Sequence, residues 1–238
     1  MKTSCYGYVF ARGGSKGVLR KNIRLLQGKP LIAYSIETLK QCRYVDRVIV
    51  STEDEEIARI AQECGAEVPF MRPAELAQDN SPELLAWQHV LQEAAKEGEV
   101  PKIFISAPAT SPFRISQDID RAVEELLNSQ ADLVIGVTPA AKNPYFHMVS
   151  MDDRGGIHPL LSLDKPITRR QDAPVCYEIA PVVYAAFSDY ILNCKNLMGG
   201  HVRGIQIPPD RAVDIDTELD FQFAEFQMSP KSVRIHGE

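Results

Sequence analysis

The chain has 238 residues, of which 45% are hydrophobic and 24% charged, a composition typical of a folded protein with one sizeable core. Its formal net charge of -6 provides no overall basic field for a polyanion, which argues against nucleic acid as a partner. The first ten residues show no signal-peptide pattern, and no apolar run is long enough to span a bilayer. The sequence therefore predicts a cytoplasmic protein without a membrane partner.

The first two thirds of the chain alternate short β-branched runs with segments of helical period, as βαβ units around a parallel sheet do. Strands are expected at residues 6–10, 48–51, 103–106 and 133–137. Apolar residues recur at i, i+3, i+4 and i+7 over residues 57–64 and 119–126, which predicts amphipathic helices there. Thr52 with Glu55 predicts a capping box for the first of these helices, and Ser116 is the expected N-cap of the second.

Residues 139–181 break this rhythm and indicate a mostly extended arm inserted into the α/β domain. Six prolines interrupt the segment: Pro139, Pro144, Pro159, Pro166, Pro174 and Pro181. Residues 1–138 and 182–238 would then form one α/β domain, with further strands at 182–187, 205–207 and 213–216 and a last helix at 218–227. From the proline-broken arm we predict a homodimer that exchanges this segment across a two-fold axis.

A glycine- and lysine-rich segment follows the first expected strand. It reads Ala11-Arg12-Gly13-Gly14-Ser15-Lys16-Gly17, with Lys21 and Asn22 shortly after it. We expect its glycines to adopt positive φ, so that successive N–H groups point at phosphate oxygens while Arg12, Lys16 and Lys21 neutralise a triphosphate. The spacing is neither a Walker A loop nor GxGxxG. Taken alone, the segment is equally compatible with a lysine-rich surface turn.

Two carboxylates near the end of the chain give the glycine-rich segment a partner. Asp214 and Asp216 stand at i and i+2 on the expected strand 213–216, which puts both side chains on one face. Two hard oxygen ligands suit Mg²⁺ when it also binds substrate phosphates. Thr217 is the expected cap of the last helix, with Asp220 at its N3 position. A solvated strand end is the alternative, but the glycine-rich segment favours the metal site.

Four motifs together resemble the acylneuraminate cytidylyltransferase family, which makes CMP-sialic acids and to which the CMP-Kdo synthetases are more distantly related. They are the glycine-rich segment, Arg72-Pro73-Ala74-Glu75-Leu76-Ala77, Thr110-Ser111-Pro112-Phe113-Arg114 and the run DIDTELD at 214–220. The resemblance extends over almost the whole chain. It implies a Rossmann-like nucleotidyltransferase fold, with a mostly parallel sheet, helices on both faces and a small extended dimerisation arm.

The resemblance also implies substrates and roles for individual residues. The substrates would be CTP and an acidic 2-keto sugar, whose anomeric 2-hydroxyl attacks the α-phosphorus and releases pyrophosphate. The implied nucleotide-binding residues are Ala11, Arg12, Gly13, Gly14, Ser15, Lys16, Asn22 and Arg72, with Arg72 reading the cytosine. The implied catalytic residues are Arg12, Lys21, Asp214 and Asp216, the last two holding Mg²⁺ as cofactor. Arg170, followed by Gln171, would face the carboxylate of the sugar.

Two departures from the family pattern concern the acceptor. Ala107-Pro108-Ala109 precede Thr110 where the family has glutamine and proline, and Ala180-Pro181 replace a typical Asn-Gly beside the sugar. The acceptor site is therefore expected to recognise a different substituent pattern. Transfer to Kdo or another acidic acceptor stays open, as does a non-catalytic nucleotide-sugar-binding homologue. The presence of every charged residue of the two motifs argues against the latter.

Overall fold

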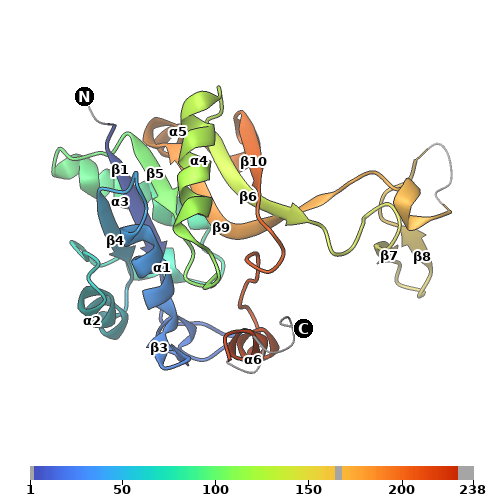
Figure 1. Cartoon of the computed structure of the whole chain (residues 1–238), viewed down its shortest axis with the longest axis horizontal. Helices are drawn as coiled ribbons and strands as arrows, with labels where there is room; N and C mark the ends of the chain where they lie inside the picture. Colours follow the sequence, from blue (N-terminus) through green and yellow to red (C-terminus); the bar gives the residue numbers. More distant parts are fainter. Residues whose placement is uncertain (1–2, 164–167, 230–238) are drawn as a thin grey trace, which may run out of the picture.

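Six strands form the central sheet, in the order β10-β6-β9-β5-β1-β4. The computed structural model describes residues 3–163 and 168–229. The strands are β1 (Cys5–Phe10), β4 (Arg47–Ser51), β5 (Ile103–Ser106), β6 (Leu133–Pro139), β9 (Tyr177–Phe187) and β10 (Val202–Gln206). β1 pairs in parallel with β4 and β5, and β10 with β6, whereas β9 runs antiparallel between β5 and β6. The predicted α/β fold with a mainly parallel sheet is confirmed (Figure 1).

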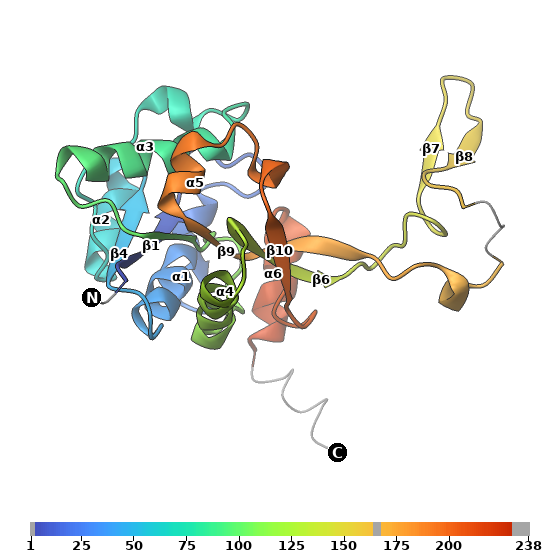
Figure 2. The same cartoon turned by 90° about the horizontal axis from the view of Figure 1, so that it is seen from above.

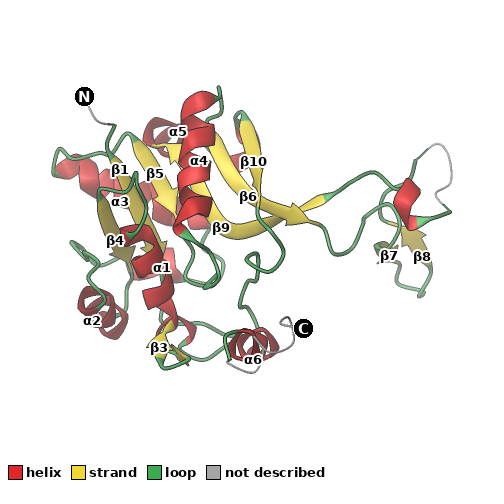
Figure 3. Ribbon diagram, in the orientation of Figure 1, coloured by secondary structure: helices red, strands yellow, loops and turns green. Residues whose placement is uncertain are grey.

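Helices cover both faces of the sheet (Figure 3). α1 (Leu31–Lys40), α2 (Glu55–Glu63) and α4 (Ser116–Asn128) pack on one face. α3 (Glu83–Lys96) and α5 (Ser188–Asn193) pack on the other. Successive strand side chains point to opposite faces, so Val9 joins the first core and Tyr8 the second. Within the described ranges no helix is long and apolar enough to cross a membrane.

Of the three helix caps that the sequence predicts, one is confirmed and two are wrong. α6 spans Glu218–Gln227, and its cap Thr217 forms the predicted capping box with Asp220. The Thr52 cap was wrong: Asp54 is the N-cap of α2, and the Thr52 hydroxyl instead accepts from the Asp54 amide. The Ser116 cap was also wrong: Ser116 is the first residue of α4, and residue 115 is its N-cap. The backbone amide of residue 115 donates to the carboxylate of Asp118.

The arm leaves the sheet where β6 ends and returns where β9 begins, at the pair Pro139 and Tyr177. Because Tyr177 to Ile179 pair with β6, β9 is longer than the expected strand 182–187, and 140–176 lie outside the sheet. Beyond this point β7 (Val149–Met151) and β8 (Ile157–Pro159) form a two-stranded sheet. The arm projects away from the body in both views (Figure 2). Pro166 lies outside the described residues.

Short elements complete the body near the end of β1. They are η1 (Lys21–Ile23), β2 (Leu25–Leu26), β3 (Lys29–Pro30) and η2 (Ala74–Ala77). A further short helix, η4 (Leu197–Gly199), precedes β10 at the opposite edge of the sheet. A small core of Leu26, Leu31, Ile215 and Phe221 packs α6 against the residues that follow the glycine-rich segment. The first thirty residues and the last helix are therefore neighbours in space.

Candidate active site

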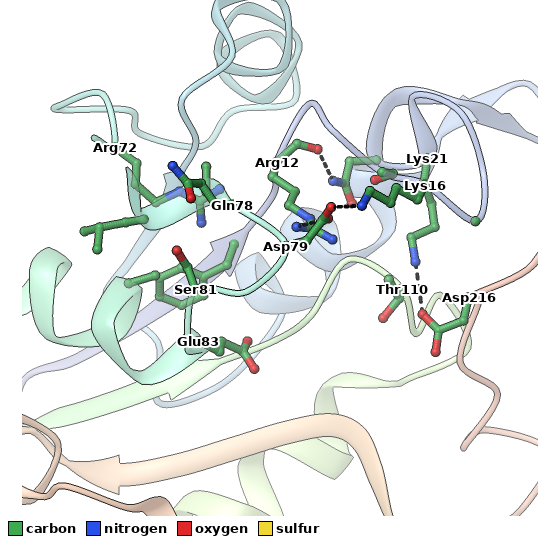
Figure 4. A pocket seen from close by; sticks show the side chains of 17 residues that line it. Arg12, Lys16, Lys21, Arg72, Gln78, Asp79, Ser81, Glu83, Thr110 and Asp216 are labelled. Atoms are coloured by element: carbon green, nitrogen blue, oxygen red, sulfur yellow. Dashed lines mark hydrogen bonds and ion pairs between the residues drawn. The ribbon is translucent and has the colours of Figure 1, made fainter. Parts of the chain in front are cut away.

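A pocket of about 610 Å³ opens where the glycine-rich segment leaves β1. β1, β4 and β5 are parallel, so their carboxyl ends meet at one edge of the sheet, where α/β folds commonly bind ligands. Side chains from four separate parts of the sequence face the hollow (Figure 4). Among the residues that line it are Phe10, Arg12, Ser15, Lys16, Gly17, Lys21, Asn22, Arg72, Gln78, Asp79, Ser81, Glu83, Thr110 and Asp216.

Lys21 joins the two ends of the chain in one wall of the pocket. Its Nζ donates to the carbonyl of Ile215 at 2.7 Å and lies 3.1 Å from Oδ1 of Asp216. The Lys21 side chain is only 13% exposed, whereas that of Asp216 is 71% exposed. Next to this contact, the two terminal nitrogens of Arg24 donate to the carboxylate of Glu218 at 2.6 and 2.7 Å. Residues almost two hundred positions apart thus form one charged surface.

The expectation that the glycines of this segment adopt positive φ was wrong. Gly13, Gly14 and Gly17 all have ordinary φ, and the left-handed residue of this region is Arg20, with φ of 53°. Two of the glycines serve close approach instead. A Cβ on Gly13 would collide with the Asp54 carboxylate, and one on Gly17 would collide with the carbonyl oxygen of Asp216. The missing side chains therefore let the segment lie directly against its neighbours.

The residues after β4 hold the glycine-rich segment in place. The Gly13 amide donates to Oε1 of Glu53 at 2.8 Å, and Oε2 of Glu53 accepts from Nη2 of Arg72 at 2.8 Å. Nη2 of Arg72 also donates to the carbonyl of Ala11 at 3.1 Å. Arg72 lines the pocket but is only 6% exposed. Its guanidinium is thus held in a fixed orientation at the pocket wall.

The other predicted nucleotide-binding residues differ in whether they line the pocket. Asn22 is buried, and its side-chain Nδ2 donates to the carbonyl of Arg12 at 2.9 Å. The same side chain thus fixes the glycine-rich segment and lines the pocket. Ser15 also lines the pocket. Ala11, Gly13 and Gly14 belong to the segment but do not contribute to the pocket wall. Their contribution is to backbone shape.

The aspartate pair is present, but not on a strand. Residues 213–216 have no ladder partner, and the Ile215 amide donates to the carbonyl of Thr110 at 2.9 Å. Ile215 is fully buried, and its neighbours Asp214 and Asp216 lie close enough for Asp216 to raise the pKa of Asp214. Burial is the largest cause of that raised pKa, and a hydrogen bond with Thr110 opposes it. Individual hydrogen bonds to Thr110, Lys21 and Asp220, and not a sheet, position the two carboxylates.

The donor set suits a hard divalent cation that also binds phosphate. Oδ1 of Asp214 is buried without a hydrogen-bond partner, and Asp216 opens onto the pocket. No group of three or more His, Cys, Asp or Glu side chains able to hold a metal occurs in the part of the chain that the structure describes. Two carboxylates with further positions for phosphate and water fit Mg²⁺, which usually keeps several water ligands.

A family model described as "Cytidylyltransferase" matches residues 7–151. The chain belongs to this family. Post-translational flagellin modification protein B of Campylobacter coli is 34% identical over 95% of both chains. CMP-N,N'-diacetyllegionaminic acid synthase of Campylobacter jejuni is 34% identical over 94% of this chain and 95% of its own length. N-acylneuraminate cytidylyltransferase of Escherichia coli is 30% identical over 94% of this chain and 52% of its own.

The solved structures agree with the observed fold. The structure of CMP:2-keto-3-deoxy-manno-octonic acid synthetase complexed with CTP has a TM-score of 0.74 at 16% identity, over 96% of this chain and all of that one. At this identity the likeness concerns the fold alone. The family model and the sequence relatives show that the chain is a cytidylyltransferase and therefore a nucleotidyltransferase enzyme, and the solved structure agrees in fold.

The predicted sugar-binding residues of this cytidylyltransferase do not line the pocket of their own chain. Arg170 and Gln171 lie in η3 (Arg170–Asp172) on the arm, away from the body. Arg169 pairs with Asp172 at 2.8 Å, whereas Arg170 forms no ion pair with any residue of the described ranges. A single chain therefore brings Asp216 together with predicted nucleotide-binding residues such as Arg12 and Arg72 at one pocket, but not Arg170.

The positions that depart from the family pattern are buried or hydrogen-bonded. Ala180 is 1% exposed in the core, and neither Ala180 nor Pro181 lines the pocket. The carbonyl of Pro181 accepts from the Ser111 hydroxyl at 3.0 Å. The carbonyl of Pro108 accepts from the Ser35 hydroxyl at 3.1 Å, so its backbone is fixed against α1. Thr110 is the residue of this stretch that lines the pocket.

Three charged residues at or behind the pocket carry no role in the sequence-based prediction. Asp79 pairs with Arg12 and Lys16 across the mouth. Glu83 lines the hollow, where the surrounding protein raises the pKa of its carboxyl group. Arg114, 3% exposed, donates to the Ser35 hydroxyl at 2.6 Å, and burial lowers its pKa to about 9. The sequence could have identified Arg114, because it belongs to the Thr110–Arg114 motif. Asp79 and Glu83 follow the Arg72 motif without a distinctive spacing that would identify them.

Proposed function

We propose that the protein transfers CMP from CTP to the anomeric 2-hydroxyl of an acidic nonulosonic sugar of the sialic or legionaminic type. The observation that carries the proposal is the contact between Lys21 and Asp216, which brings the cationic segment and one carboxylate of the aspartate pair to one pocket. Relatives named for legionaminic, pseudaminic and N-acylneuraminic acids support the class of acceptor.

In the proposed reaction the acceptor oxygen attacks the α-phosphorus of CTP. The bond from that phosphorus to the oxygen bridging the α- and β-phosphates breaks, pyrophosphate leaves, and the hydroxyl proton is released to solvent. Arg12, Lys16 and Lys21 neutralise the phosphates and the charge that shifts to the leaving group. Arg72, held by Glu53, offers donors that suit the O2 and N3 acceptors of cytosine. The protein acts mainly by positioning and by charge.

We also propose that the reaction depends on Mg²⁺ held by Asp214 and Asp216. The partnerless Oδ1 of Asp214 and the exposed carboxylate of Asp216 support this assignment. When bound, Mg²⁺ would stabilise negative charge on the phosphates as a Lewis acid. Lys21 keeps Asp216 turned toward the glycine-rich segment and supplies a further positive charge at the same place.

We propose further that the enzyme is a homodimer in which the arm of one subunit completes the sugar site of the other. The arm exposes many large apolar side chains: Phe146, Met148, Val149, Met151, Ile157, Leu160, Leu161, Leu163 and Val175. Contiguous apolar patches of this kind mark interfaces in soluble proteins. Arg170, which forms no ion pair with a described residue of its own chain, would bind the carboxylate of the sugar at the neighbouring pocket. Light scattering on active enzyme tests this: an active monomer would contradict it.

A panel of acceptors tests the activity. Purified protein is incubated with CTP and one acidic sugar at a time, with and without Mg²⁺, and pyrophosphate release is measured. We expect metal-dependent release with a legionaminic- or sialic-type acid. Because Ala180 and Pro181 replace the usual Asn-Gly, Kdo and pseudaminic acid belong in the panel, and release with Kdo alone would favour that second acceptor class. If none of the acceptors gave pyrophosphate release, the result would favour the non-catalytic binding homologue.

A further inference from the structure

Asp79 places a carboxylate against two cations of the glycine-rich segment. Its Oδ1 lies 2.7 Å from Nη1 of Arg12, and its Oδ2 contacts Nζ of Lys16. Figure 4 shows the side chain between these two cations, at the mouth of the pocket. Lys16 first, and then Arg12, hold the pKa of Asp79 below its usual value, so the carboxylate is ionised at neutral pH.

Arg12 and Lys16 are also the cations that the proposed reaction assigns to the phosphates of CTP. A carboxylate and a phosphate present the same chemistry to these groups: anionic oxygens that accept charge-assisted hydrogen bonds. Arg12 and Lys16 have further N–H donors, but a phosphate that approaches the same two cations is repelled by the adjacent negative charge of Asp79. Phosphate binding must therefore weaken or break the two ion pairs of Asp79.

The segment that carries Asp79 is built so that it can move without disturbing the core. Gln78, Asp79 and Asn80 are all exposed, and they lie between η2 and the start of α3. The backbone is fixed on one side, where the Arg72 amide donates to the carbonyl of Thr52 at 2.8 Å. On the other side it is fixed by α3, which buries Trp87 completely. Displacing Asp79 exposes no buried apolar side chain.

We propose that Asp79 is an intramolecular competitor for phosphate, which holds Arg12 and Lys16 in the free enzyme and weakens binding of CTP and pyrophosphate. The inference rests on the proposed function and deepens it. The single charge of Asp79 competes with the several charges of a triphosphate or pyrophosphate, so these ligands displace it. A ligand with one phosphate gains less from the same two cations. Asp79 thereby weakens the binding of CTP and pyrophosphate more than that of CMP and eases the departure of pyrophosphate.

The test is calorimetric titration of inorganic pyrophosphate, CTP and CMP, each with Mg²⁺, into the wild type and Asp79→Asn. We expect Asp79→Asn to bind pyrophosphate and CTP about 3- to 10-fold more tightly, since each of two partly exposed ion pairs contributes a few-fold at most. The ratio of CTP to CMP affinity should rise in the variant, because CMP displaces Asp79 less and so gains less from its removal. Glu75→Gln is the matched control, because it removes one charge from the neighbouring η2 at a side chain that does not line this pocket.

The possible outcomes distinguish a failure of the competitor role of Asp79 from a failure of the proposed function. Tighter binding in Asp79→Asn with unchanged Glu75→Gln supports the competitor role. Unchanged or weaker binding in Asp79→Asn would show that Asp79 does not compete, or that it orients the cations for the ligand, and would overturn the inference while leaving the proposed function in place. A wild type that binds neither CTP nor pyrophosphate would overturn both.

Discussion

The nucleotide pocket and the arm differ in whether their side chains find partners within the same chain. In and around the pocket, charged groups from separate parts of the sequence pair within one chain: Lys21 with Asp216, Arg24 with Glu218 and Arg72 with Glu53. Along the arm, large apolar side chains such as Met151 and Ile157 are 74% and 65% exposed. The contrast supports our proposal that one chain builds the nucleotide half of the reaction and that a second chain completes the acceptor half.

Removing the charge of Asp216 should have the largest effect. We expect Asp216→Asn to lower turnover by about 10²-fold or more with the fold intact, since charge stabilisation by a bound metal is worth several kcal/mol. The assay is pyrophosphate release at saturating CTP and acceptor, with circular dichroism as the test of folding. Asp210→Asn is the control, because this exposed side chain of the same region does not line the pocket. Wild-type turnover in Asp216→Asn would refute the metal assignment.

The second prediction concerns Arg170. Arg170→Ala should raise the KM for the sugar about 10- to 100-fold and leave the KM for CTP unchanged, because an arginine–carboxylate hydrogen bond is worth about 1.5–3 kcal/mol. Arg169→Ala is the control, since the guanidinium of Arg169 is engaged by Asp172. A raised KM for CTP in Arg170→Ala would instead place Arg170 in the nucleotide half.

Mixed dimers decide whether Arg170 acts in the neighbouring subunit. Arg170→Ala chains mixed with Asp216→Asn chains should regain activity. In the mixed dimer, the site with intact Asp216 receives an intact Arg170 from its partner. If Arg170 served its own chain, both sites would stay defective and the mixture would remain inactive.

The smallest expected effect tests how closely the two ends of the chain approach. Gly17→Ala should destabilise the protein by about 1–3 kcal/mol and weaken CTP binding, because its methyl group would collide with the carbonyl oxygen of Asp216. Denaturant unfolding and CTP titration measure the two effects. Gly14→Ala is the control for stability, as its Cβ would meet no atom within 4 Å. Equal stability of the two variants would contradict the close approach.

Local signals in the sequence predicted the elements well and the long-range contacts poorly. The bounds of α6 and its Thr217 cap were predicted because they depend on neighbouring residues. The expected strand at 213–216 was wrong, since alternation of apolar and acidic residues also fits an extended segment that has no partner strand. The glycine-rich segment was recognised, but its glycines serve close approach to Asp54 and Asp216, a property that only the folded arrangement reveals.

The residues that the sequence-based prediction missed follow the same rule. The pairing of Asp79 with Arg12 joins residues far apart in sequence, and no periodicity records such an ion pair. Glu53, which binds both the Gly13 amide and Arg72, was likewise hidden in an unremarkable stretch before α2. Arg170 was chosen by resemblance, and its placement on the arm agrees with a role that its own chain cannot complete.

The most direct test of the central claim is a crystal structure of the enzyme with CTP and Mg²⁺. The account predicts that the triphosphate lies between the glycine-rich segment and the aspartate pair, within hydrogen-bond distance of Lys21, with the metal bound by Asp214 and Asp216. Nucleotide bound elsewhere on the molecule, or a metal that contacts neither carboxylate, would contradict it.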